Sequence, residues 1–258
     1  MKLNNLAIVS MVAVLAAGAQ ATTWNFDWAP GDGGATNSSA GALQTVTSTF
    51  NDVTNQFTFE FTIGPKYGSS KVDGFYLAMN DGPNPKGKPG ELAILYFDVK
   101  SATDLRLTAY GYNGKSSGAY DSWRDGSTAW GTQSPDKIKS SITDSSWVNN
   151  MFFTQNADGS RTMGIDIDAT AINMHTPKYP SNGVDYDGIG FDENVGIWFG
   201  ALKNMKTGYN SHGFLNCMDF DKVTYLDGTN LEAVPEPGTM LVLAGLGAIA
   251  ARRRFKKN

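Results

Sequence analysis

The chain has 258 residues, 12% of them aromatic, which is enough for one domain with a sizeable hydrophobic core. Residues 22–235 carry 24 of the 25 acidic residues but only 15 of the 21 Lys and Arg residues, a net charge of −9. Nucleic-acid phosphates are bound by clusters of Lys and Arg, so an acidic body without a basic stripe excludes nucleic acid as a partner.

The first 21 residues have the pattern of a secretory signal peptide. Lys2 supplies a positive charge, and the apolar stretch that follows runs from residue 6 to residue 18. Ala19 and Ala21 form the small-x-small pattern that signal peptidase accepts, which predicts cleavage after Ala21 and export across the inner membrane. The alternative is an uncleaved anchor helix, which the shortness of the apolar stretch disfavours.

Residues 22–233 show the patterns of short β-strands. The clearest strand is QFTFEFTI, residues 56–63, where apolar and polar residues alternate as in a strand with one face on a core and one in water. The other predicted strands are residues 44–50, 72–79, 91–99, 105–112, 147–155, 161–168, 195–202 and 218–226. A helical pattern is confined to residues 168–174, where Asp168 is placed to cap one turn.

Asp-Gly and Asn-Gly dipeptides recur along the body and favour tight turns, because they tolerate positive φ. NADG, residues 156–159, predicts a hairpin, and residues 51–55 predict another. Asp73-Gly74 lies inside an apolar run and therefore predicts a bulge. Many short strands without a dividing linker predict one all-β domain, an antiparallel β-sandwich of jelly-roll-like type, with a barrel as the alternative.

Residues 234–258 contain three consecutive features: Pro235-Glu236-Pro237, an uncharged apolar run at residues 238–251, and a basic tip led by Arg252, Arg253 and Arg254. A helix over the 14 apolar residues spans about 21 Å. Because the hydrocarbon core of a bilayer is roughly 30 Å thick, we expect a short membrane helix that holds the chain only transiently. Clustered positive charge stays cytoplasmic, which predicts an exported body and a cytoplasmic C-terminus.

This ending resembles the PEP-CTERM sorting signal of Gram-negative bacteria, in which Pro-Glu-Pro, a hydrophobic helix and an arginine cluster follow one another. The resemblance implies that an exosortase, an integral-membrane enzyme of cysteine transpeptidase type, cuts near Pro235-Glu236-Pro237. The body would then pass to the surface or extracellular matrix of an exopolysaccharide-producing cell. The implied partners are signal peptidase, the exosortase and, transiently, the inner membrane. A simple C-terminal anchor is the alternative; it has the same orientation but keeps the helix.

No catalytic constellation is recognisable in the body, and we expect a non-catalytic surface or matrix protein. G-x-S-x-G is absent, and His175 and His212 lack the spacing of metal ligands. Asp166 and Asp168 share one face of a strand, as glycosidase acids can, and a secreted glycan hydrolase, the least favoured function, would depend on them. The single cysteine, Cys217, lies in the apolar stretch GFLNCMDF, so we expect it to be buried.

Two further hypotheses concern ligands. Tyr120, Trp123 and Trp130 lie in a polar segment with an Asp-Gly turn, where flat rings can stack on sugar faces. An exopolysaccharide-binding module is therefore the alternative function, unless these rings cover an edge of the sandwich. A glycine-rich stretch concentrates oxygen ligands that are candidates for a structural calcium ion, which needs six to eight of them: Asp185, Asp187, Asp192 and Glu193. No other cofactor is expected.

Overall fold

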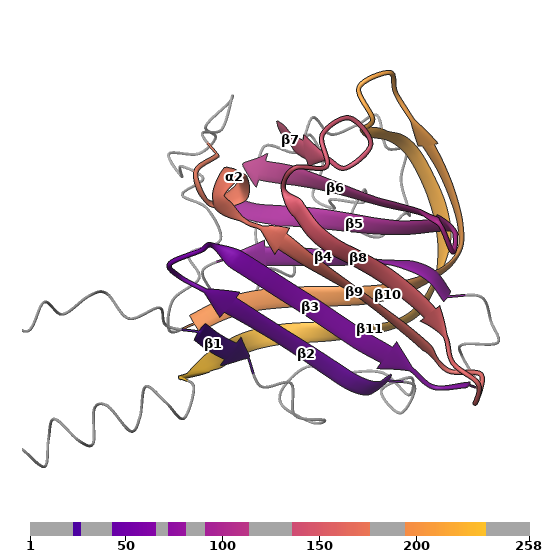
Figure 1. Cartoon of the computed structure of the whole chain (residues 1–258), viewed down its shortest axis with the longest axis horizontal. Coiled ribbons are helices and arrows are strands. Elements are labelled where there is room, and N and C mark those ends of the chain that lie inside the picture. Colours follow the sequence, from indigo (N-terminus) through magenta and orange to yellow (C-terminus); the bar gives the residue numbers. More distant parts are fainter. Residues whose placement is uncertain are drawn as a thin grey trace, which may run out of the picture.

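The computed structural model describes residues 23–26, 43–65, 72–80, 91–113, 136–175 and 194–235. These residues form an 11-stranded antiparallel sheet and one helical turn, α2 (Thr170–Asn173), as Figure 1 shows. The strands are β1 (Thr23–Phe26), β2 (Leu43–Asn51), β3 (Gln56–Ile63), β4 (Val72–Asn80), β5 (Glu91–Ser101), β6 (Asp104–Asn113), β7 (Asp136–Ser140), β8 (Val148–Gln155), β9 (Arg161–Asp168), β10 (Asn194–Tyr209) and β11 (Leu215–Pro235).

The sheet is folded over so that its two halves face each other. Its strand order is β7-β6-β5-β4-β10-β11-β1-β2-β3-β9-β8. Although β3 lies four places from β10 in this order, the ring centroids of Phe61 and Phe199 are only 4.7 Å apart, and those of Phe59 and Phe75 are 5.4 Å apart. The antiparallel all-β prediction is confirmed, and among the described strands the sheet stays open, with β7 and β8 at its ends.

The connections between strands differ from the jelly-roll-like expectation. Consecutive strands pair with one another in two meanders, β1 to β3 and β4 to β7, whereas a jelly roll is built from two Greek keys. The jelly-roll refinement is therefore wrong, because alternation along a strand reports which face is buried but carries no information on which strand is its neighbour.

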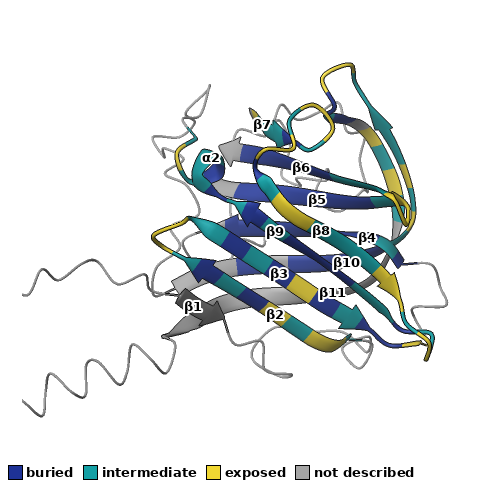
Figure 2. Cartoon of the chain, in the orientation of Figure 1, coloured by how far each residue is buried: buried dark blue, intermediate teal, exposed yellow. Residues whose placement is uncertain are grey.

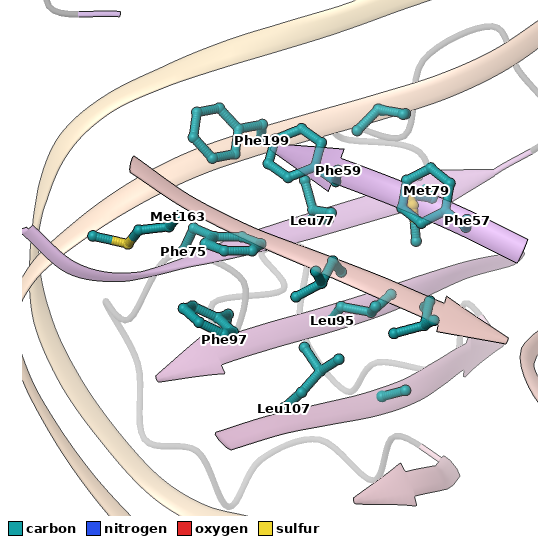
Figure 3. Packing of buried hydrophobic residues seen from close by; sticks show 14 of the residues in the cluster. Phe57, Phe59, Phe75, Leu77, Met79, Leu95, Phe97, Leu107, Met163 and Phe199 are labelled. Atoms are coloured by element: carbon teal, nitrogen blue, oxygen red, sulfur yellow. The ribbon is translucent and has the colours of Figure 1, made fainter. Parts of the chain in front are cut away.

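The core lies between the two halves and is rich in phenylalanine (Figure 3). On β3, Phe57, Phe59, Phe61 and Ile63 are fully buried and alternate with positions that are half-buried or, at Glu60, exposed (Figure 2). Phe75, Phe97 and Phe199 meet them from the opposite half, together with aliphatic side chains of β4, β5, β6 and β10. Burial of these apolar faces against each other is the main stabilising contribution to the two-layer arrangement.

All nine predicted strands are confirmed, as are the two predicted hairpin turns, at residues 51–55 and 156–159. Asn55 has φ 52°, and the Asn51 side chain accepts the N–H groups of Val53 and Thr54 in the turn between β2 and β3. In the NADG turn Gly159 has φ +87°, and the Asn156 N–H donates to Ser160 O at 2.8 Å.

The predicted bulge at Asp73-Gly74 is confirmed as well. Gly74 lies opposite Leu202 and Val72 lies opposite Lys203, so Asp73 is an extra residue on β4. Its carboxylate accepts the Met205 N–H at 3.1 Å. Burial is the main cause that raises the pKa of Asp73 above its usual value, and the bond from Met205 opposes that rise.

A second apolar cluster covers the outer face of β4, β5 and β6. The far end of the β10–β11 hairpin curves over this face (Figure 1) and brings Phe214 and Leu215 against three buried tyrosines, Tyr76, Tyr96 and Tyr110. The ring centroids of Tyr110 and Phe214 are 5.7 Å apart, and the Tyr110 hydroxyl donates to Leu215 O at 3.3 Å. The strands of this half are therefore covered on both faces, as their near-continuous apolar sequences indicate.

Within the described residues, none of the helical structure has the length and apolar character needed to cross a membrane. The predicted membrane helix at residues 238–251 lies outside those residues, as does the predicted signal peptide, residues 1–21.

Candidate functional site

The beginning of the described chain and its end lie side by side in the sheet. β1 pairs with the last three residues of β11, in the register Trp24 to Pro235, Asn25 to Val234 and Phe26 to Ala233. On its other side β1 pairs with β2, from Thr23 opposite Asn51 to Phe26 opposite Ser48. Figure 1 shows β1 between the ends of these two strands. β1 thus joins the two halves of the sheet and is the neighbour of the strand that enters Pro235-Glu236-Pro237.

Pro235 is both the last residue of β11 and the first residue of the Pro-Glu-Pro motif. A proline fits the end of a strand because it has no N–H to donate to the ladder. β10 pairs with β11 as far as Glu232, so in the described part of the chain residues 233–235 are held by β1 alone. Glu236, Pro237 and the basic tip, Arg252 to Arg254, lie outside the described residues, as do Ala19 and Ala21.

The two strand aspartates are engaged in local hydrogen bonds. Gln56 Nε2 donates to both carboxylate oxygens of Asp166, at 2.9 and 2.8 Å, and Asn149 Nδ2 donates to Oδ1 at 3.0 Å. Asp168 Oδ1 accepts the Thr170 N–H at 2.9 Å, just before α2. The prediction that Asp168 caps this turn is nevertheless wrong, because the N-cap residue is Ala169 and no side chain caps it. The two acids do lie on one face of β9, but each holds neighbouring chain segments together.

Neither histidine belongs to a metal site in the described chain, where no group of three or more His, Cys, Asp or Glu side chains is placed to hold a metal ion. His212 is exposed in the turn between β10 and β11, and His175 is half-buried just after α2. The calcium candidates Asp185, Asp187, Asp192 and Glu193 lie outside the described residues, and so do the candidate sugar-stacking rings Tyr120, Trp123 and Trp130.

The prediction that Cys217 is buried is wrong, because this cysteine is exposed. Gly208 lies opposite Cys217 while Tyr209 lies opposite Leu215, so the register of β11 shifts between residues 215 and 217. One extra residue in a strand reverses which face the following side chains occupy. Leu215 therefore packs against the outer cluster, and Cys217 faces away from it.

A buried carboxylate, Asp98 on β5, was not singled out from the sequence. It is 1% exposed, and its Oδ2 atom accepts the hydroxyls of Thr207 at 2.5 Å and Tyr209 at 2.8 Å. Lys100 Nζ lies 3.3 Å from the same oxygen and also donates to the Thr207 hydroxyl. Thr207 and Tyr209 are more than 100 residues away from Asp98 along the chain, so only the fold brings them to it.

Charged groups surround this carboxylate. The Arg106 guanidinium lies 4.9 Å from the centroid of the Tyr209 ring and forms two hydrogen bonds with Asp104. The bond from Arg106 is the main cause that lowers the pKa of Asp104. Burial, with a smaller contribution from the Asp98 charge, raises the pKa of Tyr209, so this phenol stays protonated and remains a donor. The arrangement fastens the β10–β11 hairpin to β5 and β6.

One comparison with known proteins finds a match and two do not. The family model of the PEP-CTERM protein-sorting motif matches residues 233–257, which begin at the first of the three residues of β11 that pair with β1. No curated protein and no solved structure matches the chain. The motif supports export, processing by an exosortase-type membrane protein, and transient membrane anchoring before display at the cell surface. The chain thus carries, at the end of its folded sheet, a PEP-CTERM protein-sorting motif.

Proposed function

We propose that this protein is a non-catalytic surface or extracellular-matrix protein, delivered as a folded β domain by an exosortase that removes its C-terminal segment. The observation that carries the proposal is the match of residues 233–257 to the sorting motif, directly continuous with β11. The non-catalytic part is supported by Asp166 and Asp168, whose carboxylates bind neighbouring amide and N–H groups. The short apolar run and the basic tip would then serve only as a sorting signal, which the enzyme removes.

Replacing Glu236 by alanine is expected to stop sorting, because this residue is the charged centre of Pro-Glu-Pro. The uncut precursor should accumulate in the membrane fraction while the surface fraction is depleted, as measured by immunoblotting of fractionated cells of the native host. Glu232→Ala is the matched control, since it removes the same side chain from the adjoining strand and should leave sorting unchanged. An E236A chain that reaches the surface at the wild-type level contradicts the proposal.

A second candidate function is exopolysaccharide binding, which the outer face of β2, β3, β9 and β8 favours. Side chains on this face form rows across the four strands, one of which consists of Thr45, Thr62, Thr162 and Thr154. The adjacent row contains Glu60 and Phe152, and the half-buried Phe152 ring lies over Gly164, where an added Cβ would be 2.5 Å from Phe152 Cζ. Hydroxyl and carboxylate groups beside a flat ring suit sugar hydroxyls and the apolar face of a sugar.

Phe152→Ala is expected to weaken binding to the exopolysaccharide of the native host about tenfold, the effect of losing a stacking contact of about 1.4 kcal/mol. Pull-down of the purified body with that polysaccharide measures this loss. Ile142→Ala, a truncation of an exposed apolar residue on another part of the surface, is the control. Loss of binding in Trp123→Ala and Trp130→Ala, with F152A unaffected, would assign the sugar site to the aromatic segment instead.

A further inference from the structure

We propose that β1 is a clasp on the sorting site, and that the pairing of β1 with residues 233–235 must open before the sorting enzyme cuts. The inference rests on the proposed function and adds a positioning element to it. Its basis is the register that places Trp24, Asn25 and Phe26 opposite the three residues before Glu236.

Only a short stretch of chain separates the end of β11 from the predicted membrane run. Pro235 ends β11, and the apolar run begins at Gly238. An extended chain spans at most about 3.6 Å per residue, so these two residues are no more than about 11 Å apart. A folded sheet held this close to the bilayer leaves too little free chain for an enzyme to surround the motif. Freeing residues 233–235 adds three residues and doubles the available length to about 22 Å.

β1 occupies backbone groups that an enzyme would also bind. Extended peptides are commonly bound through main-chain hydrogen bonds, as an added strand. Each backbone N–H and C=O is a strong hydrogen-bonding group, and those groups of residues 233–235 that bind β1 are not available to an enzyme at the same time. Enzyme and β1 therefore compete for the residues upstream of the cut.

The clasp can open while the rest of the domain stays folded. Among the described strands, three residue pairs hold residues 233–235, and one of these pairs involves a proline without an N–H. The pairing of β10 with β11 ends at Glu232. Short terminal pairings open at a lower free energy than the whole domain. The body can therefore stay folded while its last three residues enter the enzyme. The preceding part of β11 stays paired with β10, which limits how many residues separate from the sheet.

The position of β1 also determines which of the two cleavages, by signal peptidase or by the sorting enzyme, comes first. The predicted signal-peptidase cut after Ala21 leaves one residue, Thr22, before β1, which begins at Thr23. Signal peptidase and β1 pairing need the same stretch of chain, so the clasp forms after the signal peptide is removed. The sorting enzyme then meets a body whose two ends are already joined.

A reversible cross-link tests the clasp. Asn25 and Val234 are directly opposite in an antiparallel pair, where Cβ atoms are about 4.5–5.5 Å apart, close to the range that a disulfide spans. The full chain with Asn25→Cys and Val234→Cys, in a Cys217→Ser background, is incubated with membranes that contain the sorting enzyme. We expect no cut product from the oxidised chain and normal cutting after a reductant is added. Cysteines that fail to join under oxidation would contradict the register on which the clasp rests.

Two controls separate the clasp from other causes. Thr47→Cys with Glu60→Cys joins exposed, opposite positions of β2 and β3 and should not slow cutting. A six-residue Gly-Ser insert between Val234 and Pro235 should make the cross-linked N25C/V234C chain cut as fast as its reduced form. Equal cutting of the oxidised and reduced forms without the insert overturns the clasp. A C217S parent that is not cut at all overturns the proposed function, and with it this inference.

Discussion

Phe59→Ala is expected to lower the free energy of unfolding by about 3–5 kcal/mol. The side chain is fully buried on β3, and its ring centroid lies 5.4 Å from that of Phe75 and 5.2 Å from that of Phe199. These two partners belong to the opposite half of the sheet, so the substitution opens a cavity at the contact between the layers. Urea unfolding of the purified body, followed by tryptophan fluorescence, measures the change.

The control for this prediction is Val53→Ala, which shortens an apolar side chain that is 55% exposed in the turn after β2. Surface substitutions of this kind change stability by less than about 0.5 kcal/mol. If F59A costs no more than V53A, the two halves of the sheet do not pack against each other through β3, and the two-layer fold is wrong.

Asp98→Ala is expected to cost about 3 kcal/mol, because it leaves the hydroxyls of Thr207 and Tyr209 and the ammonium of Lys100 without their shared acceptor. The substitution should lower the stability of the whole domain and also let the β10–β11 hairpin open more often. The far end of the β10–β11 hairpin is fastened to β5 by these contacts, so amide hydrogen exchange should accelerate at residues 203–218 more than on β3.

Asp98→Asn provides the matched comparison, since its amide oxygen still accepts a hydroxyl and only the charge is lost. It should cost less than D98A in the same urea titration. An alanine variant as stable as the wild type, with unchanged exchange in the hairpin, would show that this buried carboxylate does not hold the hairpin in place.

Most of the strands could be predicted from the sequence, because alternation and turn dipeptides depend on residues within one strand or its adjoining turn. Alternation over residues 56–63 identified β3 and its buried face, and NADG identified the turn before β9 with its positive φ at Gly159. The same reasoning placed the bulge at Asp73-Gly74, where a turn dipeptide interrupts an apolar run. Each of these features depends on residues within a few positions of one another.

The features that sequence reasoning missed depend on distant partners. β1 and β7 have four and five residues, too few for a periodic pattern, and they exist as strands through the neighbours that they pair with. Asp98 is an ordinary acidic residue in the sequence, since its partners Thr207 and Tyr209 arrive from β10. The exposure of Cys217 follows from a register shift that no local signal marks.

The candidate site likewise has one part that the sequence predicts and one part that it does not. Pro235-Glu236-Pro237 and the basic tip were identified from their order in the sequence, and the family model matches the same segment. The pairing of Pro235 with Trp24 joins residues from the two ends of the chain, and a contact between such distant residues leaves no trace in a local pattern.

The most direct test of the sorting account is the intact mass of the protein recovered from the surface of its native host, with and without the sorting enzyme. We expect the surface form to begin at Thr22 and to lack the apolar run and the basic tip. In the strain without the enzyme, the signal peptide should still be absent and the C-terminal segment should remain. A surface form that retains Phe255 to Asn258 in the presence of the enzyme would contradict the account, because the C-terminal helix would then be a permanent anchor.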